Sequence, residues 1–237
     1  MMTFTFNGTN SAAYSLFISG EGTFDAPAPV GQEIDIPGRN GALYIPENRY
    51  QNISVTYPGF ITGNFSTNSA AVRSWLLSQR GYARLTDDYH TGEYRLAMVN
   101  SKLSFDPTAY NLHGKIKITF DCKPQRFLTS GESTTTISTS GGTISNLTAF
   151  NALPLLTVNG TANGTGTLTV NGTTITISKI TSGMLIDCDT MNAYKGASNL
   201  NGDISADVFP ELAPGSNAVS WTGDITSVNI VPRWWTL

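Results

Sequence analysis

The chain has 237 residues and a net charge of −3. Its length is enough for one large domain or for two small domains with separate cores. Residues 128–237 contain only three basic side chains, those of Lys179, Lys195 and Arg233. Because binding to a phosphate backbone draws on clustered Lys and Arg, and no basic stripe occurs, this composition argues against a nucleic-acid-binding protein.

The sequence also bears on compartment and redox state. It begins Met-Met-Thr-Phe-Thr-Phe, without a basic region or an apolar run of signal-peptide length, and no later segment is long enough to span a bilayer. We therefore expect a soluble protein made in a cytoplasm. Cys122 and Cys188 lie in different halves, which favours two buried free thiols over a disulfide.

The first sixty residues predict strands interrupted by breakers. Residues 3–24 alternate around an Asn-Gly turn at 7–8, and residues 25–31 form a Pro-rich bridge. Residues 32–36 then read as a strand, Pro37-Gly38 ends it, and Asn40-Gly41 is a strong hairpin signal. A second strand is expected over 49–57. Together these segments predict a long hairpin-like arm.

One helix stands out, over residues 68–80, with Asn68 or Thr67 as its N-cap and Val72, Trp75 and Leu76 on one face. Gly81 is placed to end it. Strands are expected over 82–86 and 93–99. The N-terminal half therefore reads as an α+β domain.

Residues 116–127 predict a half-buried strand that ends at Pro124 and marks a joint in the chain. The polar run that follows, to about residue 142, has too little apolar material for a core and reads as a linker or exposed edge. We therefore expect two domains, 1–128 and 129–237.

The second half is almost pure β in pattern. Short strands are expected near 153–160, 165–172, 173–178, 184–189, 219–223 and 226–235, separated by turn residues, which is typical of an antiparallel sandwich. The segment between Thr190 and Gly215 is polar and contains Pro and Gly breaks. It is predicted to be an ordered surface loop.

Chemistry-bearing residues are sparse. His90 and His113 lie near no carboxylate or cysteine cluster at metal-ligand spacing, so each is expected to be a solvated or hydrogen-bonded histidine. Asp187 and Asp189 could share a strand face and hold a hard cation, but solvated acids at a strand end are favoured. Asp87-Asp88 reads as a turn rather than an acid/base pair. We expect no enzyme activity, catalytic residue, metal or cofactor.

The last strand ends in Trp234 and Trp235, which point to opposite faces. One is expected in the core and the other on an edge or against a partner. Exposed aromatics on a sandwich can also stack on sugars, so a carbohydrate-binding module for host cell-wall adhesion is the competing class.

Several stretches together resemble the distal tail protein (Dit) family of long-tailed phages, or siphophages, that infect Gram-positive bacteria. The similarity extends over essentially the whole chain, and the order and spacing of the motifs carry it. The matching stretches are Ile36-Pro-Gly-Arg-Asn-Gly-Ala-Leu, Tyr50-Gln-Asn-Ile, Tyr57-Pro-Gly-Phe, Trp75-Leu-Leu, Gly81-Tyr-Ala-Arg-Leu, Phe120-Asp-Cys-Lys-Pro, Ile186-Asp-Cys, Phe209-Pro-Glu-Leu-Ala-Pro-Gly-Ser-Asn and Pro232-Arg-Trp-Trp-Thr-Leu.

This resemblance implies an N-terminal α+β domain with an extended β-hairpin arm and an all-β, galectin-like antiparallel sandwich at the C-terminus. It implies a structural protein of the virion, made in the host cytoplasm and placed at the tail tip or baseplate. The expected assembly is a homo-hexameric ring that lets the genome pass. Its expected partners are the tail tube protein, a tail-associated lysin or fibre protein, and a receptor-binding protein. The galectin likeness is one of fold and carries no sugar site with it.

The arm is the candidate contact between subunits. A hairpin with Pro and Gly breaks buries little against its own domain, so its backbone groups and apolar side chains need another surface. The expected inter-subunit residues are Pro37, Gly38, Arg39, Asn40, Gly41, Leu43, Tyr44 and Ile45.

Overall fold

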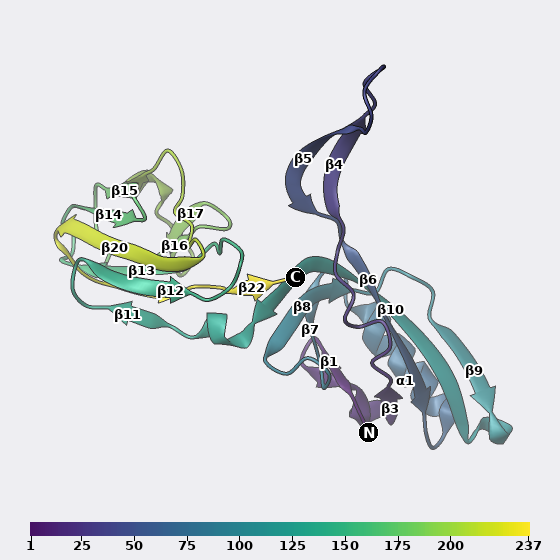
Figure 1. Cartoon of the computed structure of the whole chain (residues 1–237). Helices are drawn as coiled ribbons and strands as arrows, with labels where there is room; N and C mark the ends of the chain where they lie inside the picture. Colours follow the sequence, from purple (N-terminus) through teal and green to yellow (C-terminus); the bar gives the residue numbers. More distant parts are fainter. The chain divides into compact units, whose positions relative to one another are not determined.

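The computed structural model describes residues 1–237 and is mostly β, with one α-helix and several antiparallel sheets (Figure 1). The chain forms two compact units, Met1–Arg126 with Leu237, and Phe127–Thr236. Each unit has its own cluster of buried apolar side chains. The boundary between them falls inside one long strand, β10.

The first unit is built on an antiparallel sheet in the order β2-β1-β7-β8-β10-β6-β3, with β9 also paired to β10. The turn between β1 and β2 is Asn7-Gly8, where both residues have positive φ, 49° and 79°, as the predicted two-residue turn requires. The strands are β1 Phe4–Phe6, β2 Thr9–Asn10, β3 Leu16–Ile18, β6 Ile53–Ile61, β7 Ala83–Asp87, β8 Glu93–Met98, β9 Ser104–Thr108 and β10 His113–Leu128.

Helix α1, Phe65–Ser78, contributes Val72 and Leu76 to the core of this unit. It begins three residues before the predicted start, because Asn64, not Thr67 or Asn68, caps it: the Asn64 side chain accepts the backbone N–H of Thr67 at 3.2 Å. The Asn68 amide instead donates to the carbonyl of Thr62.

Aromatic rings join the helix to the sheet. Phe4 stacks on Tyr57 and on Trp75, with centroids 5.7 and 5.4 Å apart, and meets Phe120 edge-on. These rings come from β1, β6, α1 and β10, so one aromatic cluster fixes the centre of the sheet against the helix.

The strand predicted over residues 116–127 does not end at Pro124, as the sequence suggested. Its register with β6 runs from Gly114–Ile61 to Cys122–Ile53, and the strand continues through Pro124 to Leu128. Pro124 lies beyond the β6 ladder, so its missing N–H costs no bond on that side. Proline therefore does not stop the strand here.

The second unit consists of two antiparallel sheets, in the orders β11-β21-β13-β16-β17-β18 and β12-β20-β14-β15-β19. Both contribute to one core, which includes Leu156 and Ile230 from the first sheet and Leu168 and Val219 from the second. The strands of these sheets are β11 Thr135–Ile137, β12 Gly142–Asn146, β13 Leu155–Gly160, β14 Gly166–Val170, β15 Thr173–Ile177, β16 Met184–Asp187, β17 Asn192–Lys195, β18 Ser198–Asn199, β19 Ile204–Ser205, β20 Gly215–Gly223 and β21 Ile225–Val231. The last strand, β22 Trp235–Thr236, lies outside both sheets and pairs with β10.

Two polar segments are more ordered than the sequence predicts. The expected linker supplies β11 and begins β12, which are edge strands and place Ile137 and Ile144 in the core. The expected loop from Thr190 to Gly215 supplies β17, β18 and β19, and its Leu212 is fully buried. All five strands are short, and four of them, β11, β12, β18 and β19, lie at sheet edges. A short antiparallel strand that buries only one face needs few apolar residues.

The cap of α1 yields a first test. Asn64→Ala should lower the free energy of unfolding by about 1 kcal/mol, because it removes the side-chain acceptor at the helix N-terminus. Thr67→Ala, at an exposed position in the first turn, should change it by less than about 0.5 kcal/mol. Urea unfolding followed by circular dichroism measures both, and equal losses would contradict the assigned cap.

Candidate functional site: the exposed arm and its root

The arm consists of β4, Pro29–Ile34, and β5, Leu43–Tyr50, which pair only with each other (Figure 1). Every residue from Gln32 to Arg49 is exposed. The arm is shorter than predicted, because the expected strand over 49–57 divides at Gln51-Asn52 and its second part is β6 of the sheet. A two-stranded ribbon with neither face covered is marginal by itself in water.

The two faces of the arm differ in character. Ile34 lies opposite Leu43 and Gln32 opposite Ile45, so one face carries three aliphatic side chains. Ile34, Leu43 and Ile45 are 42%, 42% and 45% exposed. Tyr44 lies on the other face, opposite Glu33. The predicted residues Leu43, Tyr44 and Ile45 are therefore divided between the two faces.

The tip of the arm holds the other predicted residues, all exposed. Its turn is formed by Pro37-Gly38 rather than Asn40-Gly41. The N–H of Arg39 donates to the carbonyl of Ile36 at 3.1 Å, and Gly38 has φ 81°. Proline followed by a glycine of positive φ suits a type II turn. Asn40 has no positive φ, so the two-residue hairpin that Asn-Gly favours does not form.

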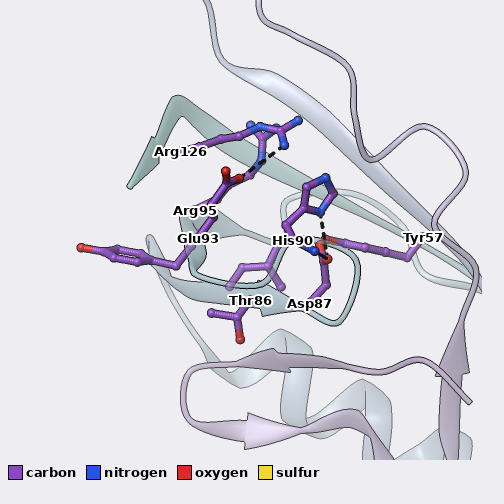
Figure 2. Close-up of a pocket in the computed structure, with 9 residues that line it drawn as sticks. Tyr57, Thr86, Asp87, His90, Glu93, Arg95 and Arg126 are labelled. Carbon is purple, nitrogen blue, oxygen red and sulfur yellow. Dashed lines mark hydrogen bonds and ion pairs between the residues drawn. The ribbon is translucent and has the colours of Figure 1, made fainter. Parts of the chain in front are cut away.

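A buried polar cluster lies beside residues 19–28, the segment between β3 and β4 that forms the first leg of the arm (Figure 2). Asp87, at the end of β7, accepts the Tyr57 hydroxyl at 2.6 Å and the backbone N–H groups of Tyr89 and His90 at 2.9 Å. His90 Nδ1 also donates to Asp87, at 2.9 Å. The aspartate thus closes the β7–β8 turn, and His90 is a hydrogen-bonded histidine, in agreement with the turn prediction for 87–90.

Two arginines complete the cluster. Arg95 on β8 and Arg126 on β10 are only 8% and 7% exposed. Arg126 lies 3.6 Å from the Glu93 carboxylate and donates to the carbonyls of Thr23 at 3.0 Å and Asp25 at 3.4 Å. Arg95 donates to the same Asp25 carbonyl at 3.5 Å. Figure 2 shows these side chains converging from β6, β7, β8 and β10.

The space enclosed by this cluster is about 10 Å³, which is the order of one water molecule and far too small for an organic substrate. Burial raises the pKa of Tyr57 well above its ordinary value, and the charge of Asp87 raises it further, so the phenol stays a hydrogen-bond donor. Burial and the charge of Arg126 lower the pKa of Arg95. The cluster is suited to holding backbone, not to acid/base chemistry.

Both cysteines are free and buried, as predicted. Burial raises the pKa of each thiol, Cys122 and Cys188, to about 12, so neither is a thiolate nucleophile at neutral pH.

Asp187 and Asp189, which the sequence favours as two solvated acids at a strand end, differ in the structure. Asp187 is buried and takes two hydrogen bonds from Arg233, at 2.7 and 3.0 Å. It also accepts the N–H groups of Asp189 and Thr190. Asp187 is therefore not the solvated acid that the sequence favoured, whereas Asp189 is exposed, in agreement with that prediction.

No group of three or more His, Cys, Asp or Glu side chains is arranged to hold a metal ion. His113, the second histidine, is exposed at the start of β10. No helix is both long and apolar enough to cross a membrane.

In the second unit, Trp235 stacks on Phe150 with centroids 4.4 Å apart and donates its Nε1–H to the carbonyl of Asn151.

Taken together, the described features define a mostly-β chain with an exposed two-stranded ribbon that has an apolar face and pairs with no other strand. No protein-family model matches the chain, and no curated protein matches it in sequence.

Among solved structures, the chain is similar to the SPP1 Dit protein, described as a paradigm of the hub adsorption apparatus in phages that infect Gram-positive bacteria. The TM-score is 0.77 at 13% identity, and the match covers 100% of both chains. The expected likeness to the distal tail protein family is confirmed at the level of the fold, over the whole chain.

The sequence did not reveal the role of Arg95 and Arg126. Each is the only arginine of its strand. The carbonyls that Arg126 contacts lie 103 and 101 residues away in the sequence. The one available signal was a charged residue at a core-facing strand position: Arg95 lies between Tyr94 and Leu96 on β8, and alternation places it inward.

The Asp187–Arg233 pair predicts a pH dependence. Burial alone would raise the pKa of Asp187, but the hydrogen bonds and charge of Arg233, with the N–H groups of Asp189 and Thr190, lower it. A lowered pKa in the folded state adds stability above the unfolded value, near 3.9, and this stability is lost as pH falls through the folded value.

We expect Asp187→Asn to cost about 2 kcal/mol at pH 7 and much less at pH 2, since charged hydrogen bonds are worth about that amount. Urea unfolding by tryptophan fluorescence at both pH values measures the difference. Asp207→Asn, at an exposed site, is the matched control and should change little at either pH. A cost of Asp187→Asn that is independent of pH would contradict the ion pair.

Proposed function

We propose that this protein is a structural hub of a phage tail tip, as the whole-length likeness to the SPP1 Dit fold suggests. In this proposal six copies form a ring at the tail tip or baseplate, with residues 1–128 forming the ring and residues 129–237 forming a galectin-like sandwich. The ring joins the tail tube protein to a tail-associated lysin or fibre protein and to receptor-binding components, and the genome passes through it. The protein acts by contact and not as an enzyme.

The observation that carries the proposal is the exposed arm on this fold. Ile34, Leu43 and Ile45 form an aliphatic face that no other part of its own unit covers. Because each side chain is less than half exposed in the ribbon, covering it is worth about 1 kcal/mol. A ring repeats this contact at every subunit, so a modest gain per side chain becomes a stable assembly.

A sugar-binding module is the second candidate. An open, polar hollow lies beside β17, lined by residues that include Asn192, Tyr194 and Asn199. Its amide oxygens are already engaged, however: Asn201 donates to Asn192 at 3.0 Å and to Asn199 at 2.8 Å. Calorimetric titration of the full chain with cell-wall saccharides separates the two candidates, and the hub proposal expects no heat of binding.

The arm can be tested directly. The double substitution Leu43→Asp and Ile45→Asp should convert the assembled protein to monomers, because it places two charges on the aliphatic face, and deleting residues 37–48 should do the same. Light scattering on the purified full chain gives the mass. Val208→Asp is the control, since Val208 is 65% exposed and lies outside the arm. Arm variants that assemble like the control would place the subunit contact elsewhere.

If the genome passes through the proposed ring, we expect the channel wall not to bind DNA. Each Lys or Arg that neutralises a phosphate adds affinity through counterion release and would retard passage. With a net charge of −3 and no clustered basic run, the assembled protein should show no measurable binding to duplex DNA at physiological salt. Fluorescence anisotropy at low and high salt is the measurement. Tight binding that survives high salt would contradict the role as a conduit.

A further inference from the structure

We propose that Arg126, assisted by Arg95, is a positioning residue that fixes the direction of the arm by gripping its first leg. The inference rests on the proposed function of the arm as the contact between copies, and it assigns a role to the buried cluster of Figure 2. Neither arginine touches the partner surface in this scheme. Both act through the backbone of residues 23–25.

The two legs of the arm are held in different ways. The second leg passes through Gln51-Asn52 into β6, so the sheet carries it. Asn52 adds hydrogen bonds from its amide to Tyr82 at 2.6 Å and to Asp121 at 3.0 Å. The first leg, residues 19–28 between β3 and β4, contains no helix or strand. Backbone bonds tie its two ends, from the Ser19 N–H to the Pro58 carbonyl at 2.8 Å and from the Gln51 N–H to the Ala28 carbonyl at 3.0 Å, so it is the middle of the leg that needs side chains to hold it.

The cluster provides this hold at the middle of the first leg. The Arg126 guanidinium donates to the carbonyls on both sides of Phe24, those of Thr23 and Asp25, and Arg95 donates to the second. The Phe24 ring packs at a tilt of 49° against the His90 ring with centroids 4.4 Å apart, although Phe24 is 68% exposed. One residue of the leg is thus held by its two flanking carbonyls and by its ring.

The segment before this point is shaped to reach it. Thr23 is 1% exposed, and its hydroxyl and N–H both donate to the Gly20 carbonyl, at 2.8 and 3.3 Å. Gly22 has φ 73°, which suits the third position of such a turn. The Tyr89 ring lies where a side chain at position 20 would be, 2.6 Å from an added Cβ. The turn therefore delivers the Thr23 carbonyl to the guanidinium.

The chemistry explains why arginine is used. A planar guanidinium stays charged when buried and offers donors in several fixed directions, so it can bind two carbonyls and face the Glu93 carboxylate at once. A ribbon whose direction is fixed before contact loses less conformational freedom when it docks on a second copy. This clamp, formed by Arg126 and Arg95 on the backbone of residues 23–25, therefore favours assembly without contributing to the interface.

Hydrogen exchange on the unassembled full chain tests the clamp. Arg126→Gln should raise exchange in peptides covering residues 19–30 about tenfold to a hundredfold, the effect of losing charged hydrogen bonds, and leave β6 and the first half of β10 unchanged. Glu93→Gln removes the ion pair but keeps the carbonyl bonds, so it should leave the leg protected. Ring formation, measured separately by light scattering, should weaken only in Arg126→Gln.

A second variant covers the case in which Arg126→Gln does not fold. Phe24→Ala removes an exposed ring and its contact with the His90 ring, and it should raise exchange in the same peptides with the core unaffected. Unchanged protection of residues 19–30 in the folded variants would overturn the clamp, as would a rise spread evenly over the sheet. Because exchange is read on unassembled protein, failure of the clamp is distinct from failure of the ring.

Discussion

The structure depends on one constraint: a two-stranded ribbon cannot cover its own faces. β4 and β5 satisfy each other's inner backbone groups but leave two outer edges and an aliphatic face in water. The remainder of the first unit supports this ribbon. An aromatic cluster fixes α1 against the sheet, β6 carries one leg, and the cluster of Asp87, His90, Arg95 and Arg126 grips the other. The first unit is therefore a packed base that carries an uncovered arm, and the proposed assembly rests on this arm.

The second unit contains few charged residues and depends mainly on its apolar core. Its two sheets share one apolar core, and its one strong buried ion pair, Asp187 with Arg233, ties the end of β16 to the segment before β22. The pair is bidentate and partly buried, which favours a defined geometry over a large net gain in stability. This unit is thus two antiparallel sheets that share one apolar core.

Much of this fold was predictable from local signals. Asn7-Gly8, the alternation of residues 116–120, and the run of short strands after residue 150 each gave the right element, because turn chemistry and period-two patterning act over few residues. The prediction of an arm was right in kind but too long, since β5 and β6 read as one strand until Gln51-Asn52 divides them. The helix start was missed because Asn64 and Asn68 are equally good caps in sequence.

What the sequence could not show are contacts made across long separations. Nothing near Arg126 indicates that its partners are the carbonyls of Thr23 and Asp25, because backbone acceptors leave no mark in a sequence. Likewise the polar segments at 128–142 and 190–215 lack the apolar content of central strands, yet edge pairing orders them. The whole-chain resemblance pointed to the distal tail protein family, and the likeness to the SPP1 Dit structure confirms it at the level of a mostly-β fold.

The central claim is that the arm is covered by a neighbouring copy, and isotope-mixed crosslinking tests it most directly. Full-length protein with a photo-crosslinking residue at position 45, on the aliphatic face of the arm, is assembled from equal amounts of ¹⁵N-labelled and unlabelled chains and then irradiated. The account predicts crosslinked peptide pairs that join an arm of one isotope to residues 1–128 of the other, in the proportion expected for contact between copies. Links formed only within one isotope would show that the arm folds back on its own chain, and would contradict the account.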